Sequence, residues 1–415
     1  MRLASLAPDL TPLRASQPYR RLLAGDAISV IGTQVTLVAV PFQVYEQTRS
    51  AGAVGLVGLA GLLPIIVLGL YGGAIADAVD RRRLVLGTTS AQAVLALVLL
   101  AQAAAGLEQT WLLYAVVAAQ SGLFAVDSPA RQAFVPRLLP TELLPAANAL
   151  RQVEFNLGVA IGPLLAGVLV SQFSYQAAYG LDAVSFLAAL LAVRGLPAMA
   201  PEGGGRRAGT ASVLEGLQFL RTRPVLLTTF VLDLVAMVMA MPRALFPALA
   251  DTVFGGGPQT AGLLYSALAV GGLVGALSSG WFGRVHRHGL AVIWAILAWG
   301  ASIAVFGLTD QLWLALVMLA LAGGSDMVSA VFRTAILQAA APDEMRGRIG
   351  GVFIVVVAGG PRLGDGRAGG AAALVGLEGA VVSGGLVVVA ATCAVAARVP
   401  RFRAYDVRDA ERVRD

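Results

Sequence analysis

Long apolar runs, each about the length of a membrane-spanning helix, constrain this chain more than any other feature. One run covers residues 51–71 and another covers residues 84–105, and the stretch GGAIADAVDRRR (residues 72–83) lies between them. A helix in the core of a soluble protein does not need such an abrupt change from apolar to charged residues. Two membrane spans joined by a tight loop do, because the chain passes from lipid to water and back. We therefore expect an all-α integral membrane protein.

The composition supports this expectation for the whole chain. Of its 415 residues, 57% are hydrophobic and only 13% are charged, and the mean hydropathy is +0.78. A soluble protein of this length needs more charge on its surface. At about 20 residues per span plus short loops, there is room for about twelve transmembrane helices. We expect these spans at residues 20–46, 52–76, 83–105, 110–132, 144–170, 174–195, 224–250, 259–283, 288–308, 311–337, 348–374 and 377–398.

The basic residues indicate the orientation of the chain. All 30 of them are arginine, and the formal net charge is +6. Nucleic-acid binding is one explanation of this charge, but the arginines lie at span ends in alternate loops, as the positive-inside rule requires. We therefore expect a multi-pass protein of the plasma (inner) membrane. Both termini are expected in the cytoplasm, with the lipid bilayer as a partner and no nucleic-acid partner.

The sequence lacks the signatures of enzymes and of bound cofactors. Cys393 has no second cysteine with which to form an internal disulfide. His286 and His288 lie in a basic loop without a cluster of acids or thiols beside them. The chain contains no phosphate-binding loop, no nucleotide fingerprint and no histidine near a plausible nucleophile. We expect no enzymatic activity, no cofactor and no metal site.

The second half of the chain repeats features of the first half. Residues 73–84 align with 279–290. Beyond this loop, four matches at similar offsets pair residues 131–142 with 333–344, Asp26 with Asp233 to within one residue, Pro41 with Pro247, and Gly162-Pro163 with Gly360-Pro361. Such repetition indicates two pseudo-symmetric six-helix bundles that arose by internal duplication. The expected parts are a cytoplasmic N-terminal tail (1–19), an N-terminal bundle (20–195), a cytoplasmic linker (196–223), a C-terminal bundle (224–398) and a cytoplasmic C-terminal tail (399–415).

Ionisable residues within spans are functional candidates, because each costs about 2.5–3.5 kcal/mol at the centre of a membrane helix. Asp26 and Asp233 occupy corresponding helices of the two halves, and we expect them to bind a proton or a cationic group. For Asp26 the alternative is a simple ion pair with Arg20 or Arg21, near the end of the same span.

Two further charged pairs are expected to be structural. Asp127 and Arg131 are four residues apart, and Asp326 and Arg333 are seven apart, so each pair shares one face of its helix. We expect these pairs to fix the cytoplasmic ends of their helices.

The segment GGPRLGDGRAGG is the densest group of charges at apparent membrane depth. Arg362 and Asp365 within it are candidates for binding substrate or a proton, since an arginine there can meet an anionic substrate. The alternative is that the helix ends early and that this segment, which includes Arg367, is an outer loop.

The loop at residues 72–83 resembles the loop between the second and third helices of the major facilitator superfamily, G-x-L-A-D-R-x-G-R-R. Gly73 and Asp77 match this pattern, as do Arg81 and Arg82, and these four are the expected gating residues. Ala78 stands where the pattern has an arginine, and Asp80 stands where it has a glycine. The resemblance implies a loop that gates the cytoplasmic side.

The fifth expected span has a smooth glycine face. Gly158, Gly162 and Gly167 lie along it, and Pro163 bends the helix. This pattern is similar to the G-x-x-x-G-P motif of superfamily antiporters, although close helix packing alone also explains it.

Over residues 15–405 the chain resembles the enterobactin-exporter branch of this superfamily. The stretches that carry the resemblance include PARQAFVPRLLP (129–140), FNLGVAIGPLLAG (155–167), FPALAD (246–251), GALSSG (275–280), PDEMRGRIGG (342–351) and GGPRLGD (359–365). The resemblance implies the major facilitator fold and a monomeric, secondary active exporter that uses protons to move a siderophore or drug-like molecule by alternating access. A non-transporting sensor or assembly partner of the same fold, or an importer, is the alternative. The stretch AVVAAQSG (115–122) lacks the arginine usual in drug antiporters, so we do not expect proton coupling through that residue.

Overall fold

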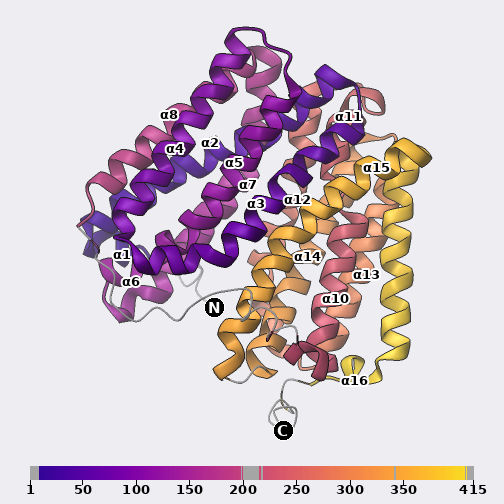
Figure 1. The fold of residues 1–415 in the computed structure, drawn as a ribbon. Helices are drawn as coiled ribbons and strands as arrows, with labels where there is room; N and C mark the ends of the chain where they lie inside the picture. The colour runs from indigo at the N-terminus through magenta and orange to yellow at the C-terminus, as the bar shows by residue number, and fades with distance from the viewer. Residues whose placement is uncertain are drawn as a thin grey trace. The chain divides into compact units, whose positions relative to one another are not determined.

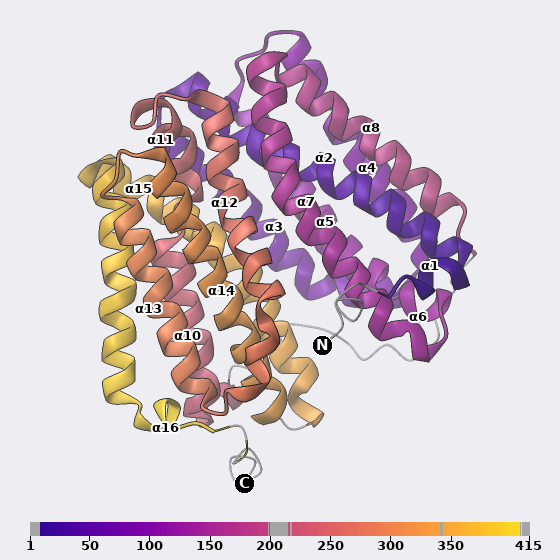
Figure 2. The same ribbon diagram turned by 180° about the vertical axis from the view of Figure 1, so that it is seen from behind.

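The structure is a computed structural model that describes residues 9–197, 199, 215, 218–340, 343–406 and 408. Within these residues the regular elements are helices (Figures 1 and 2), and eleven are long and apolar enough to cross a membrane. The all-α fold is thereby confirmed.

The first half contains α1 (Thr11–Ala15), α2 (Gln17–Thr48), α3 (Ala51–Ala78), α4 (Arg81–Ala104), α5 (Thr110–Gln132), α6 (Val135–Leu138), the 3-10 turn η2 (Thr141–Leu143), α7 (Leu144–Gln172) and α8 (Tyr175–Arg194). The second half contains α10 (Pro224–Ala240), the 3-10 turn η3 (Arg243–Leu245), α11 (Phe246–Thr252), α12 (Gly257–Leu277), the 3-10 turn η4 (Ser279–Arg284), α13 (His288–Phe306), α14 (Leu312–Ala340), α15 (Asp343–Arg398) and α16 (Pro400–Arg403).

Helix α15 is two spans joined at Gly376. This residue has φ of 77° and ψ of 171°, a backbone conformation that side chains disfavour and glycine tolerates. The chain reverses there, from the orange segment to the yellow segment of Figure 1. Dividing α15 at Gly376 turns the eleven candidate spans into the expected twelve.

The seventh expected span, residues 224–250, is interrupted where the sequence predicts one helix. Helix α10 ends at Ala240, and the chain resumes as η3 and α11. Pro242 is the cause, because proline disfavours helical backbone at the residue before it. Met241 accordingly has an extended conformation, with φ of −76° and ψ of 114°.

The chain divides into two compact units. Unit 1 comprises Met1–Val40 and Val67–Ala208, and unit 2 comprises Pro41–Ile66 and Gly209–Asp415. In unit 1, α4 packs along α5 and α8. In unit 2, α14 packs against α12 and α13, and α15 packs against α10 and α13. The two six-helix bundles, 20–195 and 224–398, stay a prediction, and most of the expected linker, 196–223, lies outside the described residues.

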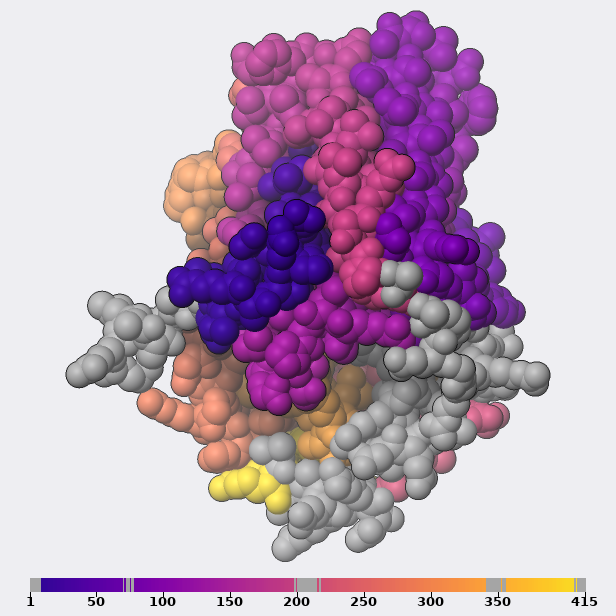
Figure 3. All heavy atoms as spheres, turned by 90° about the vertical axis from the view of Figure 1, so that its left-hand side faces the viewer, coloured from indigo at the N-terminus to yellow at the C-terminus, as the bar shows by residue number. Residues whose placement is uncertain are grey.

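The described part of the predicted N-terminal tail (1–19) is built into unit 1. Tyr19 is fully buried, and its hydroxyl donates a hydrogen bond to the carbonyl oxygen of Ala147 (2.9 Å). Leu13 of α1 packs on the same apolar cluster, which also contains Val135 and Leu150. Figure 3 shows this indigo segment lying against the magenta segment that contains the start of α7.

Candidate functional site

The guanidinium of Arg131 on α5 lies at the centre of a charged cluster in unit 1. Its Nη1 donates to Oδ1 of Asp26 on α2 (2.5 Å), and its Nε pairs with Asp127 on its own helix. Its Nη2 donates to Oγ1 of Thr89 on α4 (2.6 Å). One side chain therefore joins three helices. We call Asp26, Asp127 and Arg131 the first triad.

The first triad is closely surrounded by protein. The hydroxyl of Thr88 on α4 donates a hydrogen bond to Oδ1 of Asp127 (2.5 Å). The side chains of Asp26 and Arg131 are 12% and 16% exposed, and Asp127 is buried. Asp26 thus pairs across helices, and not with the Arg20 or Arg21 that the sequence offered as partners.

A corresponding cluster in unit 2 surrounds Arg333 on α14. Arg333 forms an ion pair with Asp233 on α10, and both side chains are less than 10% exposed. Asp326, also on α14, lies 3.6 Å from Arg333, and its side chain is 41% exposed. We call Asp233, Asp326 and Arg333 the second triad. It contains the acid predicted to bind a proton and the pair predicted to be structural.

Both triads have two carboxylates and one arginine, so each carries one excess negative charge when all groups are ionised. Further charges act on each triad from neighbouring helices. Arg151 and Glu154 on α7 act on Asp26, and Arg243 acts on Asp326. The structure therefore combines candidates that the sequence treated as separate proton sites and structural ion pairs.

The glycine face of α7 packs on α2, close to the first triad. A side chain at Gly158 would meet Val30, and one at Gly162 would meet Gln34 and the carbonyl oxygen of Ile31. Both glycines are buried, as are Pro163 and Gly167. Close packing of α7 on α2 is therefore one function of this face, whether or not it also has the antiporter role implied by the resemblance.

The segment 362–367 is helical throughout and lies within α15, so the alternative of an outer loop is wrong. Asp365 lies where α15 crosses α3. A Cβ at Gly55 would lie 2.7 Å from the carbonyl oxygen of Asp365, and one at Gly58 would lie 2.6 Å from its Cβ. Oδ1 of Asp365 is buried without a hydrogen-bond partner, and Arg362 donates to the carbonyl oxygen of Ala358 on its own helix (2.8 Å).

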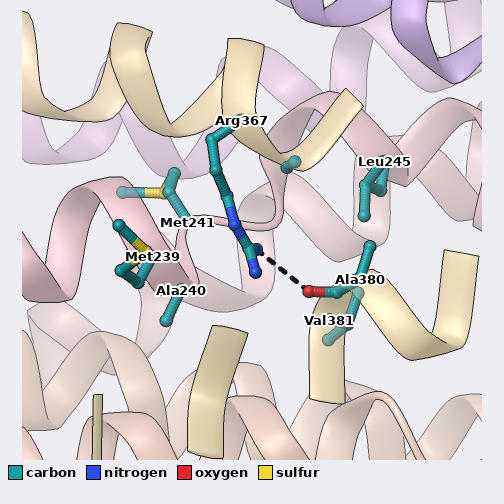
Figure 4. A pocket seen from close by; sticks show the side chains of 8 residues that line it. Met239, Ala240, Met241, Leu245, Arg367, Ala380 and Val381 are labelled. Carbon is teal, nitrogen blue, oxygen red and sulfur yellow. Dashed lines mark hydrogen bonds between the residues drawn. The ribbon is translucent and has the colours of Figure 1, made fainter. Parts of the chain in front are cut away.

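Arg367 has a different environment from Arg362. Figure 4 shows it in a pocket lined by Met239 and Met241, with its guanidinium directed at Ala380. Its Nη1 donates to the carbonyl oxygen of Ala380 (3.0 Å), and its Nη2 donates to Oγ of Ser383 (3.3 Å). Arg367 therefore ties together the two spans that meet at Gly376.

The expected gating loop is held against the end of α8 in unit 1. Asp80 caps α4 by accepting from the backbone N–H of Arg83 (2.9 Å), and it also accepts from the N–H of Met199 (3.0 Å). This capping role accounts for an acid where the family pattern has glycine. Arg82 donates to the carbonyl oxygen of Arg194 (2.6 Å). The backbone N–H of Arg81 donates to the carbonyl oxygen of Met199 (3.2 Å). The surroundings of Gly73 and the side chain of Asp77 lie outside the described part of the structure.

The ionisable residues of the spans that the sequence analysis missed include Asp182, Glu154 and Arg243. Asp182 on α8 is 1% exposed and accepts a hydrogen bond from Oγ1 of Thr36 (2.6 Å). Glu154 lies near the first triad, and Arg243 lies at the break in the seventh span. Asp182 and Arg243 stand in apolar runs, so the reasoning applied to Asp26 would have found them, whereas Glu154 stands in the polar stretch RQVEFN (151–156).

Comparisons with known proteins agree over most of the chain. The model of a family described as transmembrane secretion effectors matches residues 7–415. The chain is 31% identical to the enterobactin exporter EntS of Citrobacter koseri, over 92% of each protein. It is 30% identical to the enterobactin exporter EntS of Escherichia coli O1:K1 / APEC, over 88% of each protein.

Two solved structures share the fold at low sequence identity. A point mutant of the nucleoside transporter NupG has a TM-score of 0.77 and 13% identity, covering 92% of this chain and 99% of that chain. A POT family transporter in complex with 5-aminolevulinic acid has a TM-score of 0.74 and 13% identity, covering 93% of this chain and 97% of that chain. These likenesses concern the fold alone, and they confirm the fold class that the resemblance implied.

Proposed function

Because the chain belongs to the transmembrane secretion effectors of the major facilitator superfamily, in the enterobactin-exporter-like branch, we propose that it is a proton-coupled exporter. It is a multi-pass membrane transporter of a small molecule and not an enzyme. The cargo we propose is a siderophore or drug-like compound, since its relatives are named as enterobactin exporters. We place it in the plasma (inner) membrane as a monomer with both termini in the cytoplasm. The arginine bias supports this orientation, and the resemblance supports the monomeric state.

The two triads carry the proposal of proton coupling. In each triad one arginine is shared by two carboxylates, which leaves a net charge of about −1 in surroundings where unpaired charge is costly. Binding one proton makes the triad neutral. Because the arginine keeps a carboxylate partner in either state, a triad can gain and lose a proton without leaving the guanidinium unpaired.

The second triad is the better proton carrier of the two. In the first triad both carboxylates pair with Arg131, and threonine hydroxyls complete the bonding. In the second, Asp326 is 3.6 Å from Arg333 and 41% exposed, so it is the more loosely paired carboxylate. When Asp233 accepts a proton, its ion pair with Arg333 weakens and Arg333 can move toward Asp326. Proton binding is thereby linked to a change in the contact between α10 and α14.

The test is gradient-driven transport by the purified protein in proteoliposomes, with enterobactin as the cargo. With a proton-coupled antiporter, an acidic lumen drives enterobactin into the liposome as protons leave. In Asp233→Asn, which keeps the shape of the side chain but cannot ionise, we expect gradient-driven accumulation to fall to the level of empty liposomes. Exchange of labelled for unlabelled enterobactin without a gradient should continue.

The matched control is Asp26→Asn in the first triad, for which we expect gradient dependence to remain. If Asp233→Asn responds to the gradient like the wild type, Asp233 does not carry the proton. Accumulation driven only by an acidic exterior would indicate an importer. A folded wild type that neither accumulates nor exchanges any cargo tested would favour the non-transporting alternative.

The loop formed by Gly73, Asp77, Arg81 and Arg82 retains its proposed gating role. The support is its match in kind to the family pattern, together with the contact of Arg82 with the end of α8. An anchored loop can bias an equilibrium between two conformations without forming part of the substrate site.

A further inference from the structure

Arg243 occupies an unusual place for a charged residue. It is the first residue of η3, immediately after Met241 and Pro242 interrupt the seventh span, and it is half-buried. A charged side chain within a span is expensive, so it generally has a partner or a function. The break also matters, because interrupted membrane helices in transporters commonly lie at binding sites.

The backbone at this break is firmly held. The hydroxyl of Tyr265 on α12 donates to the carbonyl oxygen of Arg243 (2.9 Å). The ring of Phe246 meets Tyr265 edge-on, with ring centroids 4.9 Å apart, and also meets Phe306 edge-on at 6.0 Å. The irregular backbone is thus part of a packed aromatic cluster, which fixes where the side chain of Arg243 begins.

The guanidinium of Arg243, by contrast, is weakly bound by the rest of the protein. Its Nε donates to Sδ of Met241 (3.4 Å), and a thioether is a weak acceptor. Among the side chains that the structure describes at residues 41–66, 218–340 and 356–406, no carboxylate forms an ion pair with Arg243 or with Arg362. The side-chain bond found for Arg362 is to Ala358, on its own helix.

The two arginines lie close to each other and to Asp365. Helix α15 approaches the break closely at Gly364, where a Cβ would lie 3.0 Å from the Cβ of Met241. Among charged groups, Arg243 acts most strongly on both Arg362 and Asp365. The cluster therefore contains two cations and one anion, and the carboxylate has a buried oxygen with no hydrogen-bond partner.

We propose that Arg243 and Arg362 form a subsite for an anionic group of the transported molecule, such as a carboxylate or an ionised phenol. The inference rests on the proposed function as an exporter and adds a substrate class to it. Guanidinium groups suit this role because they bind planar oxyanions through paired hydrogen bonds. Asp365 balances part of the positive charge when the subsite is empty, and Arg243 determines the preference for anions over cations.

The experiment measures binding by the purified full-length protein, so it does not depend on proton-driven export. The probes are fluorescein, which is anionic, and rhodamine 123, which is cationic and has the same ring system. Fluorescence anisotropy should show tighter binding of fluorescein by the wild type. In Arg243→Gln and Arg362→Gln we expect roughly 10- to 100-fold weaker fluorescein binding, the size expected for a lost charge-assisted hydrogen bond. Asp365→Asn should bind fluorescein several-fold more tightly, since it loses the opposing charge.

The matched control is Arg367→Gln, on the same helix, whose guanidinium is bound to Ala380 and Ser383. It should bind fluorescein like the wild type. Arg243→Lys keeps the charge and should retain part of the affinity, which separates loss of the subsite from loss of the fold. Equal binding of both dyes by the wild type, or unchanged fluorescein binding by Arg243→Gln, would overturn the proposal. Failure of gradient-driven transport with these binding results intact would overturn only the proposed coupling.

Discussion

The two triads have the same charges on corresponding helices, yet they differ in how completely those charges are paired. In the first, Arg131 contacts both acids and Thr89, and Thr88 completes the bonding of Asp127. In the second, Arg333 pairs closely with Asp233, whereas Asp326 lies farther away and is partly exposed. We propose that duplication of the charge pattern has not duplicated its function. We infer that a fully paired cluster fixes helices, whereas a loosely paired one can exchange a proton.

The largest expected difference between the triads is in stability. Arg131→Ala leaves Asp26 and Asp127 without their cation, and breaking a buried ion pair costs about 3–5 kcal/mol. Arg333→Ala should cost less, because it leaves one buried carboxylate, Asp233, without its cation, whereas Asp326 is already loosely paired. Thermal unfolding in detergent should show a lower midpoint for Arg131→Ala than for Arg333→Ala.

A triple variant provides the control for this prediction. Adding Asp26→Asn and Asp127→Asn to Arg131→Ala removes the uncompensated charges, so it should recover much of the lost stability. Equal midpoints for the two single variants would show that the triads do not differ in the way their geometry indicates.

The glycines that the duplication pairs, Gly162 and Gly360, offer a smaller effect. A Cβ at Gly162 would overlap Gln34 and lie 3.3 Å from the carbonyl oxygen of Ile31, whereas one at Gly360 would lie 3.2 Å from the Cβ of Met237. Gly162→Ala should therefore destabilise unit 1 by about 1–3 kcal/mol, as overpacking does. Gly360→Ala should cost less, because its contact is looser. The comparison of unfolding midpoints fails if Gly360→Ala is the more damaging change.

The smallest effect concerns the threonine hydroxyls. Thr89 accepts a hydrogen bond from Arg131, whereas Thr229 on α10 donates to the carbonyl oxygen of Leu226 on its own helix (2.7 Å). Thr89→Val should therefore destabilise the protein by about 1 kcal/mol more than Thr229→Val, since only the first leaves a charged donor without its acceptor. If unfolding midpoints are equal for the two variants, the hydroxyl contributes little to the first triad.

The sequence by itself determined that this chain crosses the membrane about twelve times. It also placed most spans to within a few residues, with the interrupted seventh span as an exception: α5 runs over Thr110–Gln132, as predicted, and α8 over Tyr175–Arg194, against a prediction of 174–195. This was possible because apolar runs and clustered arginines are local features, and the bilayer imposes the length of each span directly. The pairs Asp127–Arg131 and Asp326–Arg333 were also predictable, since spacing along one helix fixes which residues share a face.

Only the tertiary structure decided which helices share their charges. The pairing of Asp26 with Arg131 joins residues 105 positions apart, and nothing in local spacing specifies it. The position of Arg243 beside Arg362 likewise depends on how α15 packs on the interrupted seventh span, which Pro242 alone does not fix. Membrane helices are individually specified by the solvent around them, but their contacts depend on close packing of small residues such as Gly364, and packing partners are not encoded by hydropathy.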